Sequence, residues 1–141
     1  MIDQRFAPYA AALLRISLGA MWISHALLKY FVFTIGGFAG FLTTHGLPAV
    51  FAWPVFLMEL IGGILIAVGI RGRLVSFALL PILIGATVVH AGNGWVFTSA
   101  NGGWEYPVFL ISTSIVHMLL GDGALALTSA PTFATGRLRS A

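Results

Sequence analysis

The 141-residue sequence contains no cysteine, which excludes disulfide bonds, thiolate zinc sites, iron–sulfur clusters held by cysteine and thiol catalysis. Charge is scarce as well: Asp, Glu, Lys and Arg make up 8% of the chain, against roughly a quarter in an ordinary soluble domain. A soluble fold of this size could not cover a chain that is 59% hydrophobic, because most of its surface must face water. The mean hydropathy of +0.99 therefore indicates an integral membrane protein.

The chain has only four acidic residues, so its formal net charge is +3 and its pI is near 10. A basic chain can bind nucleic acid when its Lys and Arg residues form a patch on one face. Here the seven Lys and Arg residues are scattered singly, so we exclude nucleic acid as a partner.

Four apolar segments are long enough to cross the membrane, because a helix needs about 20 residues to span a hydrocarbon core of roughly 30 Å. They run over about residues 8–33, 51–70, 73–91 and 104–120. None shows the alternation of a membrane barrel strand. We therefore predict an all-α bundle of four transmembrane helices, a single domain over residues 1–127, and a disordered cytoplasmic tail over 128–141.

The basic residues predict the orientation of this bundle, because cytoplasmic loops of membrane proteins carry an excess of Lys and Arg. Four spans place both termini and the middle loop on one side. That side holds six of the seven basic residues, namely Arg5, Arg15, Arg71, Arg73, Arg137 and Arg139, and the other side holds only Lys29. We predict that both termini lie in the cytoplasm, with the lipid bilayer as the surrounding partner.

A short amphipathic helix is predicted between the first and second spans. Phe38, Phe41, Leu42 and His45 are spaced i, i+3, i+4 and i+7, and the segment ends at Gly46-Leu47-Pro48. Such a pattern favours a helix that lies on the outer membrane surface. His45 is interpreted as an interfacial residue.

Five ionisable residues are predicted to gather in the outer half of the bundle. At about 1.5 Å of rise per residue, His25 and Glu59 both lie roughly 12 Å below the outer helix ends. A charged group at such a depth costs about 2.5–3.5 kcal/mol on insertion scales, so it should face the bundle interior. The predicted ligand-binding cluster is His25, Lys29, Glu59, His90 and Glu105.

Each member of this cluster also has a structural interpretation. Lys29 can extend to the interface, and Glu105 can favour the positive N-terminal end of its helix. His90 can donate to a carbonyl, and Glu59 can pair with His25 or Lys29. In the inner half, Arg15 and Asp122 are predicted to form a structural ion pair.

Several short motifs, in order along the chain, resemble the DoxX family of small bacterial membrane proteins. One departure is Ala26, where the family has Gly after the histidine. The matching motifs are Leu14-Arg15, Gly19, His25-Ala26-Leu27-Leu28-Lys29, Gly37-Phe38-Ala39-Gly40-Phe41, Gly46-Leu47-Pro48, Glu59-Leu60-Ile61-Gly62-Gly63, Gly69-Ile70-Arg71-Gly72-Arg73 and Gly103-Trp104-Glu105-Tyr106-Pro107.

The resemblance implies four transmembrane helices in the bacterial inner membrane and a link to quinol oxidation or oxidative-stress complexes. The leading hypothesis is a membrane subunit of a quinone-linked redox system, with a polar ligand pocket in the outer half and a partner protein that supplies electrons. A quinone is the only cofactor or substrate that this reading implies, because the sequence contains no evident haem or flavin motif.

Three other functions remain open from the sequence, and whether the chain is an enzyme is left undecided. The nearest competitor is a non-catalytic subunit that anchors or assembles a complex. A transporter of protons or small solutes would favour a homo-oligomer, because four helices make a narrow bundle. The last alternative is a metal site of His25, Glu59 and His90, whose ligand types suit zinc, copper or iron.

Overall fold

The computed structural model describes residues 3–128, and the predicted tail from residue 129 onward lies outside them. The described residues contain no strand, which confirms the all-α prediction. The helices are α1 (Ala7–Phe31), α2 (Thr34–Thr44), α3 (Ala52–Val68), α4 (Gly72–His90) and α5 (Glu105–Leu120), with two single 3-10 turns, η1 (Ala49–Phe51) and η2 (Ala91–Asn93).

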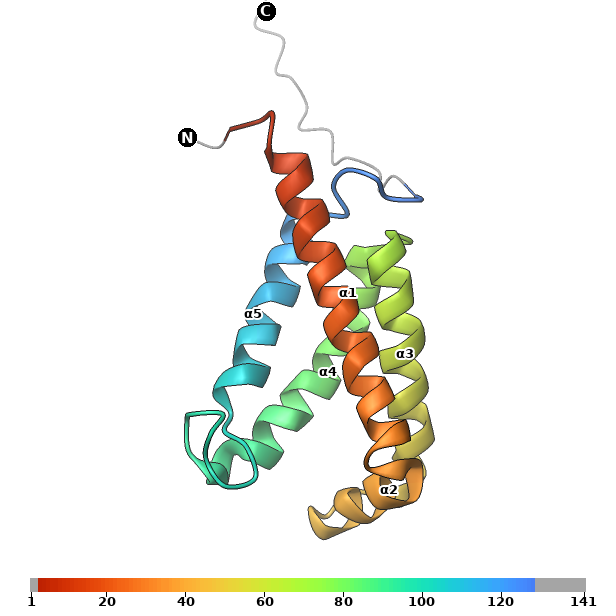
Figure 1. The fold of residues 1–141 in the computed structure, drawn as a ribbon, viewed down its shortest axis with the longest axis vertical. Helices are drawn as coiled ribbons and strands as arrows, with labels where there is room; N and C mark the ends of the chain where they lie inside the picture. Colours follow the sequence, from red (N-terminus) through yellow and green to blue (C-terminus); the bar gives the residue numbers. More distant parts are fainter. Residues whose placement is uncertain (1–2, 129–141) are drawn as a thin grey trace, which may run out of the picture.

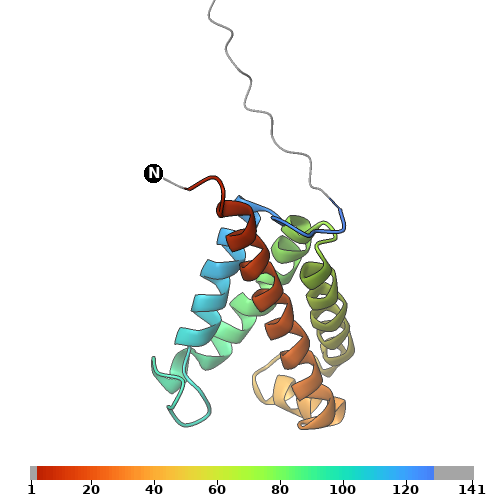
Figure 2. The same ribbon diagram turned by 45° about the horizontal axis from the view of Figure 1, so that its top comes forward.

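Four long helices run beside one another, and the short helix α2 lies at one end of the group (Figure 1). The segment from α4 to α5 turns at that same end, which we call the loop end. Residues near both termini lie at the opposite end with the turn between α3 and α4, which we call the terminus end (Figure 2). The helix α2 packs on α1 and α3 through Phe38 and Leu42, the two buried members of its apolar stripe.

Local chemistry explains where these helices begin and end. Pro8 lies in the first turn of α1, where its missing N–H breaks no helical hydrogen bond. The helix α3 ends at Gly69, whose φ of +75° is the left-handed conformation that glycine adopts most readily. The Ile70 N–H then donates to the Leu65 carbonyl over 2.9 Å, which closes the end of α3 and sends the chain into α4.

Three helical stretches are long and apolar enough to cross a membrane: Ala7–Phe31, Ala49–Val68 and Gly72–Asn93. The helix α5 is apolar but has only 16 residues, or about 24 Å at 1.5 Å per residue. Residues 3–128 therefore form an all-α structure with three candidate spans and a shorter fourth apolar helix.

The closest helix contact is between α1 and α3, at positions where both helices carry glycine. A Cβ added to Gly19 would lie 2.7 Å from the backbone nitrogen of Ala67, and one added to Gly63 would lie 2.9 Å from that of Ile23. Both distances are shorter than real Cβ contacts, so the two backbones can approach this closely only without those side chains. Beside this contact lies the apolar core of Leu18, Trp22, Ile66, Leu79, Leu83 and Leu110.

The other glycines differ in what surrounds them. A Cβ on Gly62 would meet the Leu79 side chain at 2.9 Å, and that side chain can move. Nothing lies within 4 Å of a Cβ added to Gly85 in α4, so the face of α4 that carries Gly85 does not meet another helix there.

We predict that Gly63→Leu lowers the thermal unfolding temperature of the protein in detergent far more than Gly85→Leu does. The leucine at position 63 must push apart two backbones, whereas the leucine at position 85 enters open space. Gly62→Leu should fall between them, because the Leu79 side chain can yield. Equal unfolding temperatures for the variants at positions 63 and 85 would contradict the α1–α3 contact.

Candidate functional site

The most buried acidic group at the loop end is Glu59, whose side chain is 3% exposed and is paired with Lys29. The Lys29 Nζ donates to both carboxylate oxygens of Glu59, over 2.9 Å to Oε1 and 2.7 Å to Oε2. Lys29 comes from α1 and Glu59 from α3, so this ion pair joins the two helices that pack most closely. Of the two partners that the sequence left open for Glu59, the structure selects Lys29.

The Lys29 ammonium also lies 5.2 Å from the centre of the Phe38 ring on α2, within the range of a cation–π contact. The same ammonium therefore touches α2 as well as α3. A single charged side chain thus connects three helices at the loop end, and Lys29 is not simply extended into water at the membrane interface.

His25, one turn before Lys29 on α1, contacts a different partner. Its ring stacks on Tyr106 at the start of α5, with the ring centres 5.6 Å apart and the planes 19° from parallel. The Tyr106 hydroxyl is buried and has no hydrogen-bond partner among residues 3–128. Tyr106 was not among the five residues of the predicted cluster, although it directly follows Glu105 in the sequence.

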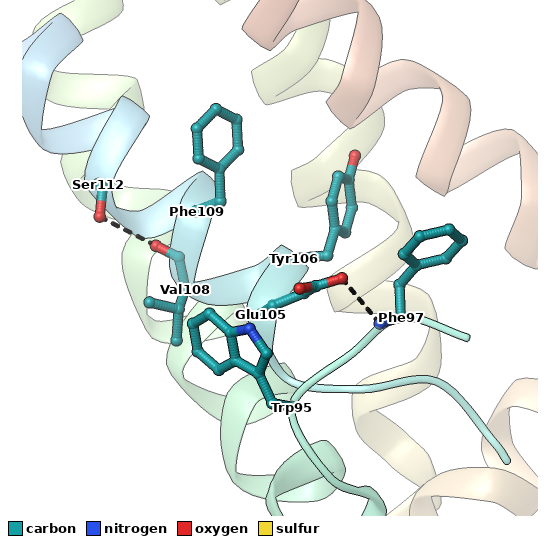
Figure 3. Close-up of a pocket in the computed structure, with 7 residues that line it drawn as sticks. All are labelled: Trp95, Phe97, Glu105, Tyr106, Val108, Phe109 and Ser112. Atoms are coloured by element: carbon teal, nitrogen blue, oxygen red, sulfur yellow. Dashed lines mark hydrogen bonds between the residues drawn. The ribbon is translucent and has the colours of Figure 1, made fainter. Parts of the chain in front are cut away.

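Glu105 lies in the first turn of α5, and its carboxylate holds the preceding loop. The Glu105 Oε1 accepts a hydrogen bond of 2.8 Å from the Phe97 backbone N–H (Figure 3). Glu105 and Tyr106 both line a pocket of about 470 Å³, which we call the aromatic pocket. Its other lining residues are Trp95, Phe97, Val108, Phe109 and Ser112.

His90, at the end of α4, belongs to neither group. Its Nδ1 bonds the Ala86 carbonyl over 2.7 Å, and its ring lines a second pocket together with His45. The five residues of the predicted cluster thus lie at one end of the bundle in separate groups: Lys29 with Glu59, His25 with Tyr106, Glu105 with the loop, and His90 with its own helix. Within residues 3–128 no three His, Asp or Glu side chains form a metal-binding arrangement, so the proposed metal site of His25, Glu59 and His90 has no geometric support.

The terminus end holds a second buried polar network, which includes Arg15 and Asp122. The 2% exposed Arg15 donates through Nη1 to the main-chain oxygen of Asp122 over 3.0 Å and through Nη2 to that of Leu125 over 3.3 Å. The Asp122 carboxylate instead approaches Nε2 of His117 at 3.3 Å, and His117 Nδ1 bonds Ser76 over 2.8 Å. Arg15 and Asp122 are therefore neighbours, but the aspartate carboxylate accepts a hydrogen bond of 3.2 Å from the Gly72 N–H and lies beside the His117 ring.

This network fastens the segment after α5 to the rest of the bundle. The Ala124 N–H donates to the Pro8 carbonyl over 2.9 Å, and the Thr128 N–H donates to the Gly69 carbonyl over 3.0 Å. Residues 121–128 thus connect the start of α1 to the end of α3. The bonds of Arg15 and Ser76 at this end join helices to one another and to the segment after α5, which fits a structural role, while Arg15 Nε and Ser114 Oγ are buried without a hydrogen-bond partner among residues 3–128.

Apolar helices of spanning length, an ion pair between two of them and a short helix packed at one end are the features of an α-helical membrane protein. The chain belongs to the DoxX family, whose profile matches residues 10–92, that is, α1 to the end of α4. Over 115 residues it is 32% identical to a Bacillus subtilis (strain 168) protein named "Putative oxidoreductase CatD", covering 82% of this chain and 81% of the relative. No solved structure shows significant similarity to it.

We predict that Glu59→Leu alone destabilises the protein by about 3–5 kcal/mol, because it leaves the Lys29 ammonium buried without its partner. The double variant Lys29→Met/Glu59→Leu should recover most of this loss, since two apolar side chains replace two buried charges. Thermal unfolding in detergent measures both, with Met58→Leu, an exposed neighbour of Glu59, as the control. If the double variant is no more stable than Glu59→Leu, the Lys29 and Glu59 charges do not stabilise each other.

Proposed function

We propose that this DoxX protein is a membrane subunit of a quinone-linked redox system and that the quinone ring binds in the aromatic pocket. One observation carries this proposal. Glu105 and Tyr106 line the pocket, and Tyr106 also stacks on His25, so the pocket adjoins the ionisable groups at the loop end.

The chemistry of the lining suits a quinone. Trp95, Phe97 and Phe109 offer aromatic surface to a flat ring, and the side chains of Trp95 and Phe109 are more than half exposed. Reduction of a quinone takes up two electrons and two protons. The Glu105 carboxyl group, held in place by the Phe97 N–H, is a proton carrier at the pocket wall, and a reduced partner protein supplies the electrons.

The membrane topology of this proposal uses α5 as the fourth span. At about 24 Å, α5 is shorter than a typical span, and local thinning of the bilayer accommodates such a helix at modest cost. It packs against α4 and α1 and runs from the loop end to the terminus end (Figure 1). Arg15, Arg71 and Arg73 lie at the terminus end, so we place that end in the cytoplasm and the loop end on the outer side of a bacterial inner membrane.

The name of the Bacillus relative agrees with a redox role, since that protein is called a putative oxidoreductase. The name supports the class of reaction and says nothing of the quinone, which rests on the pocket chemistry described above.

A non-catalytic anchoring subunit is the second candidate, and the Lys29–Glu59 pair favours it. Both carboxylate oxygens of Glu59 already accept hydrogen bonds from Lys29, so the pair holds α1 against α3 without any ligand. The two candidates differ in whether the protein binds a quinone at all.

The experiment measures the binding of a decyl-chain benzoquinone to the protein in lipid nanodiscs. We expect Phe109→Ala to weaken this binding about tenfold, because the variant removes one aromatic wall of the pocket, a contact worth roughly 0.5–1.5 kcal/mol beyond its buried area. Phe77→Ala is the matched control, since Phe77 is similarly exposed, on α4, and lines neither pocket. If the wild-type protein does not bind the quinone, the anchoring function is the remaining candidate. If Phe109→Ala and Phe77→Ala weaken binding equally, the quinone does not bind in the aromatic pocket.

A further inference from the structure

We propose that the loop between α4 and α5 inserts three side chains into the outer leaflet of the bilayer and so extends the apolar length of α5. The three residues are Trp95, Val96 and Phe97, which we call the apolar tip. The partner of this surface is lipid, at the level where the acyl chains meet the headgroups. The inference rests on the topology proposed above, in which α5 is the fourth span, and does not depend on the quinone.

The apolar tip is exposed although all three of its side chains are large and apolar. The exposed fractions are 51% for Trp95, 49% for Val96 and 68% for Phe97. No charged residue occurs between positions 91 and 104, so the loop has no charge with which to bind a charged protein surface. Exposed aromatic side chains without charged neighbours favour the boundary between headgroups and acyl chains.

The length of α5 leaves part of the bilayer uncovered at this end. Its 16 residues cover about 24 Å, whereas the hydrocarbon core is roughly 30 Å thick, so about 6 Å remains. At the terminus end the Arg73 guanidinium donates to the carbonyls of Leu119 and Leu120, so a charged group marks the membrane boundary there. The missing length therefore lies at the loop end, where the apolar tip reduces the thinning that α5 alone would require.

The backbone of the apolar tip is bonded to protein groups, which contact with acyl chains requires because they offer no hydrogen bonds. The Phe97 N–H donates to the Glu105 carboxylate over 2.8 Å (Figure 3). The Trp95 carbonyl accepts from the Glu105 N–H over 3.0 Å, and the Val96 carbonyl accepts from the Ser99 N–H over 3.0 Å. The same bonds hold the loop against the Glu105 carboxylate, so this charge is paired with the loop backbone.

The rest of the loop is polar, so the loop as a whole is amphipathic. Thr98, Ser99 and Asn101 follow the apolar tip, and we call residues 98–101 the polar half. Figures 1 and 2 show the loop at the loop end beside α4 and α5, on the opposite side from α2. The helix α2 thus occupies the loop end beside α1 and α3, and the loop occupies it beside α4 and α5.

The experiment uses single-cysteine variants, because the chain has no native cysteine and each variant then carries one spin label. Val96→Cys tests the apolar tip, and Ala100→Cys is the control in the polar half; both positions are exposed. The labelled protein is placed in vesicles of phosphatidylethanolamine and phosphatidylglycerol. Electron paramagnetic resonance then measures collisions of the label with oxygen, which concentrates in lipid, and with a neutral nickel chelate, which stays in water.

The ratio of oxygen to nickel collisions should be severalfold higher at position 96 than at position 100. Equal ratios at these two positions would refute insertion of the apolar tip. A label at position 96 that neither reagent reaches would refute it as well, because protein rather than lipid would then cover the tip.

Ile115→Cys, at an exposed position of α5, tests the topology separately. A label in lipid at position 115 and in water at position 96 would refute the inserted loop and leave α5 as the fourth span. Nickel collisions as frequent at position 115 as at position 100 would refute the span on which the proposal rests.

A second measurement needs no purified protein. In native membranes opened on both sides by freezing and thawing, a membrane-impermeant maleimide should modify Val96→Cys severalfold more slowly than Ala100→Cys. After denaturation in detergent the two variants should react at the same rate. Equal rates in the native membrane would contradict the inserted loop.

Discussion

The arrangement of the loop end depends on one constraint: the charges of Lys29 and Glu59 cannot face lipid. Between apolar helices each charge needs a partner of opposite sign. Lys29 lies on α1 and Glu59 lies on α3, so the two charges meet where α1 packs against α3. Gly19 and Gly63 make that approach close enough, because neither position has room for a Cβ. The same lysine contacts the Phe38 ring, so the surface helix α2 is positioned by the same pair.

The two ends of the bundle use their polar groups differently. At the terminus end, Arg15, Ser76, His117 and Asp122 contact one another and the segment that follows α5, and these contacts hold the helix ends together. At the loop end, Glu105 and His90 lie at the walls of pockets, with aromatic side chains beside them. This contrast is the physical reason to seek ligands at the loop end.

The sequence predicted which segments form helices, but not how each helix is rotated about its own axis. Hydrophobic runs predicted the helices to within a few residues, and the stripe of Phe38 and Leu42 predicted α2. Counting residues from a helix end gives the depth of His25 and Glu59 but not which neighbour each one faces. His25 contacts Tyr106 and Lys29 contacts Glu59 because α1 presents His25 to α5 and Lys29 to α3.

The sequence did not predict which side chains come together where loops and helix ends meet. The apolar run of residues 104–120 predicted α5, but not that the chain after it would fold back to bring the Asp122 carboxylate to His117. The pairing of His45 with His90 in one pocket depends on how α2 lies relative to α4, and no spacing within either segment specifies that.

The central claim, that the aromatic pocket at the loop end binds a quinone, is tested most directly by the ligand content of the native protein. The protein is extracted with its surrounding lipid in polymer-bounded particles, and the quinone in them is measured by mass spectrometry per protein chain. Quinone enriched well above its ratio to lipid in the parent membrane, and displaced by added decyl-chain benzoquinone, is the predicted result. A quinone-to-lipid ratio equal to that of the parent membrane would contradict the claim.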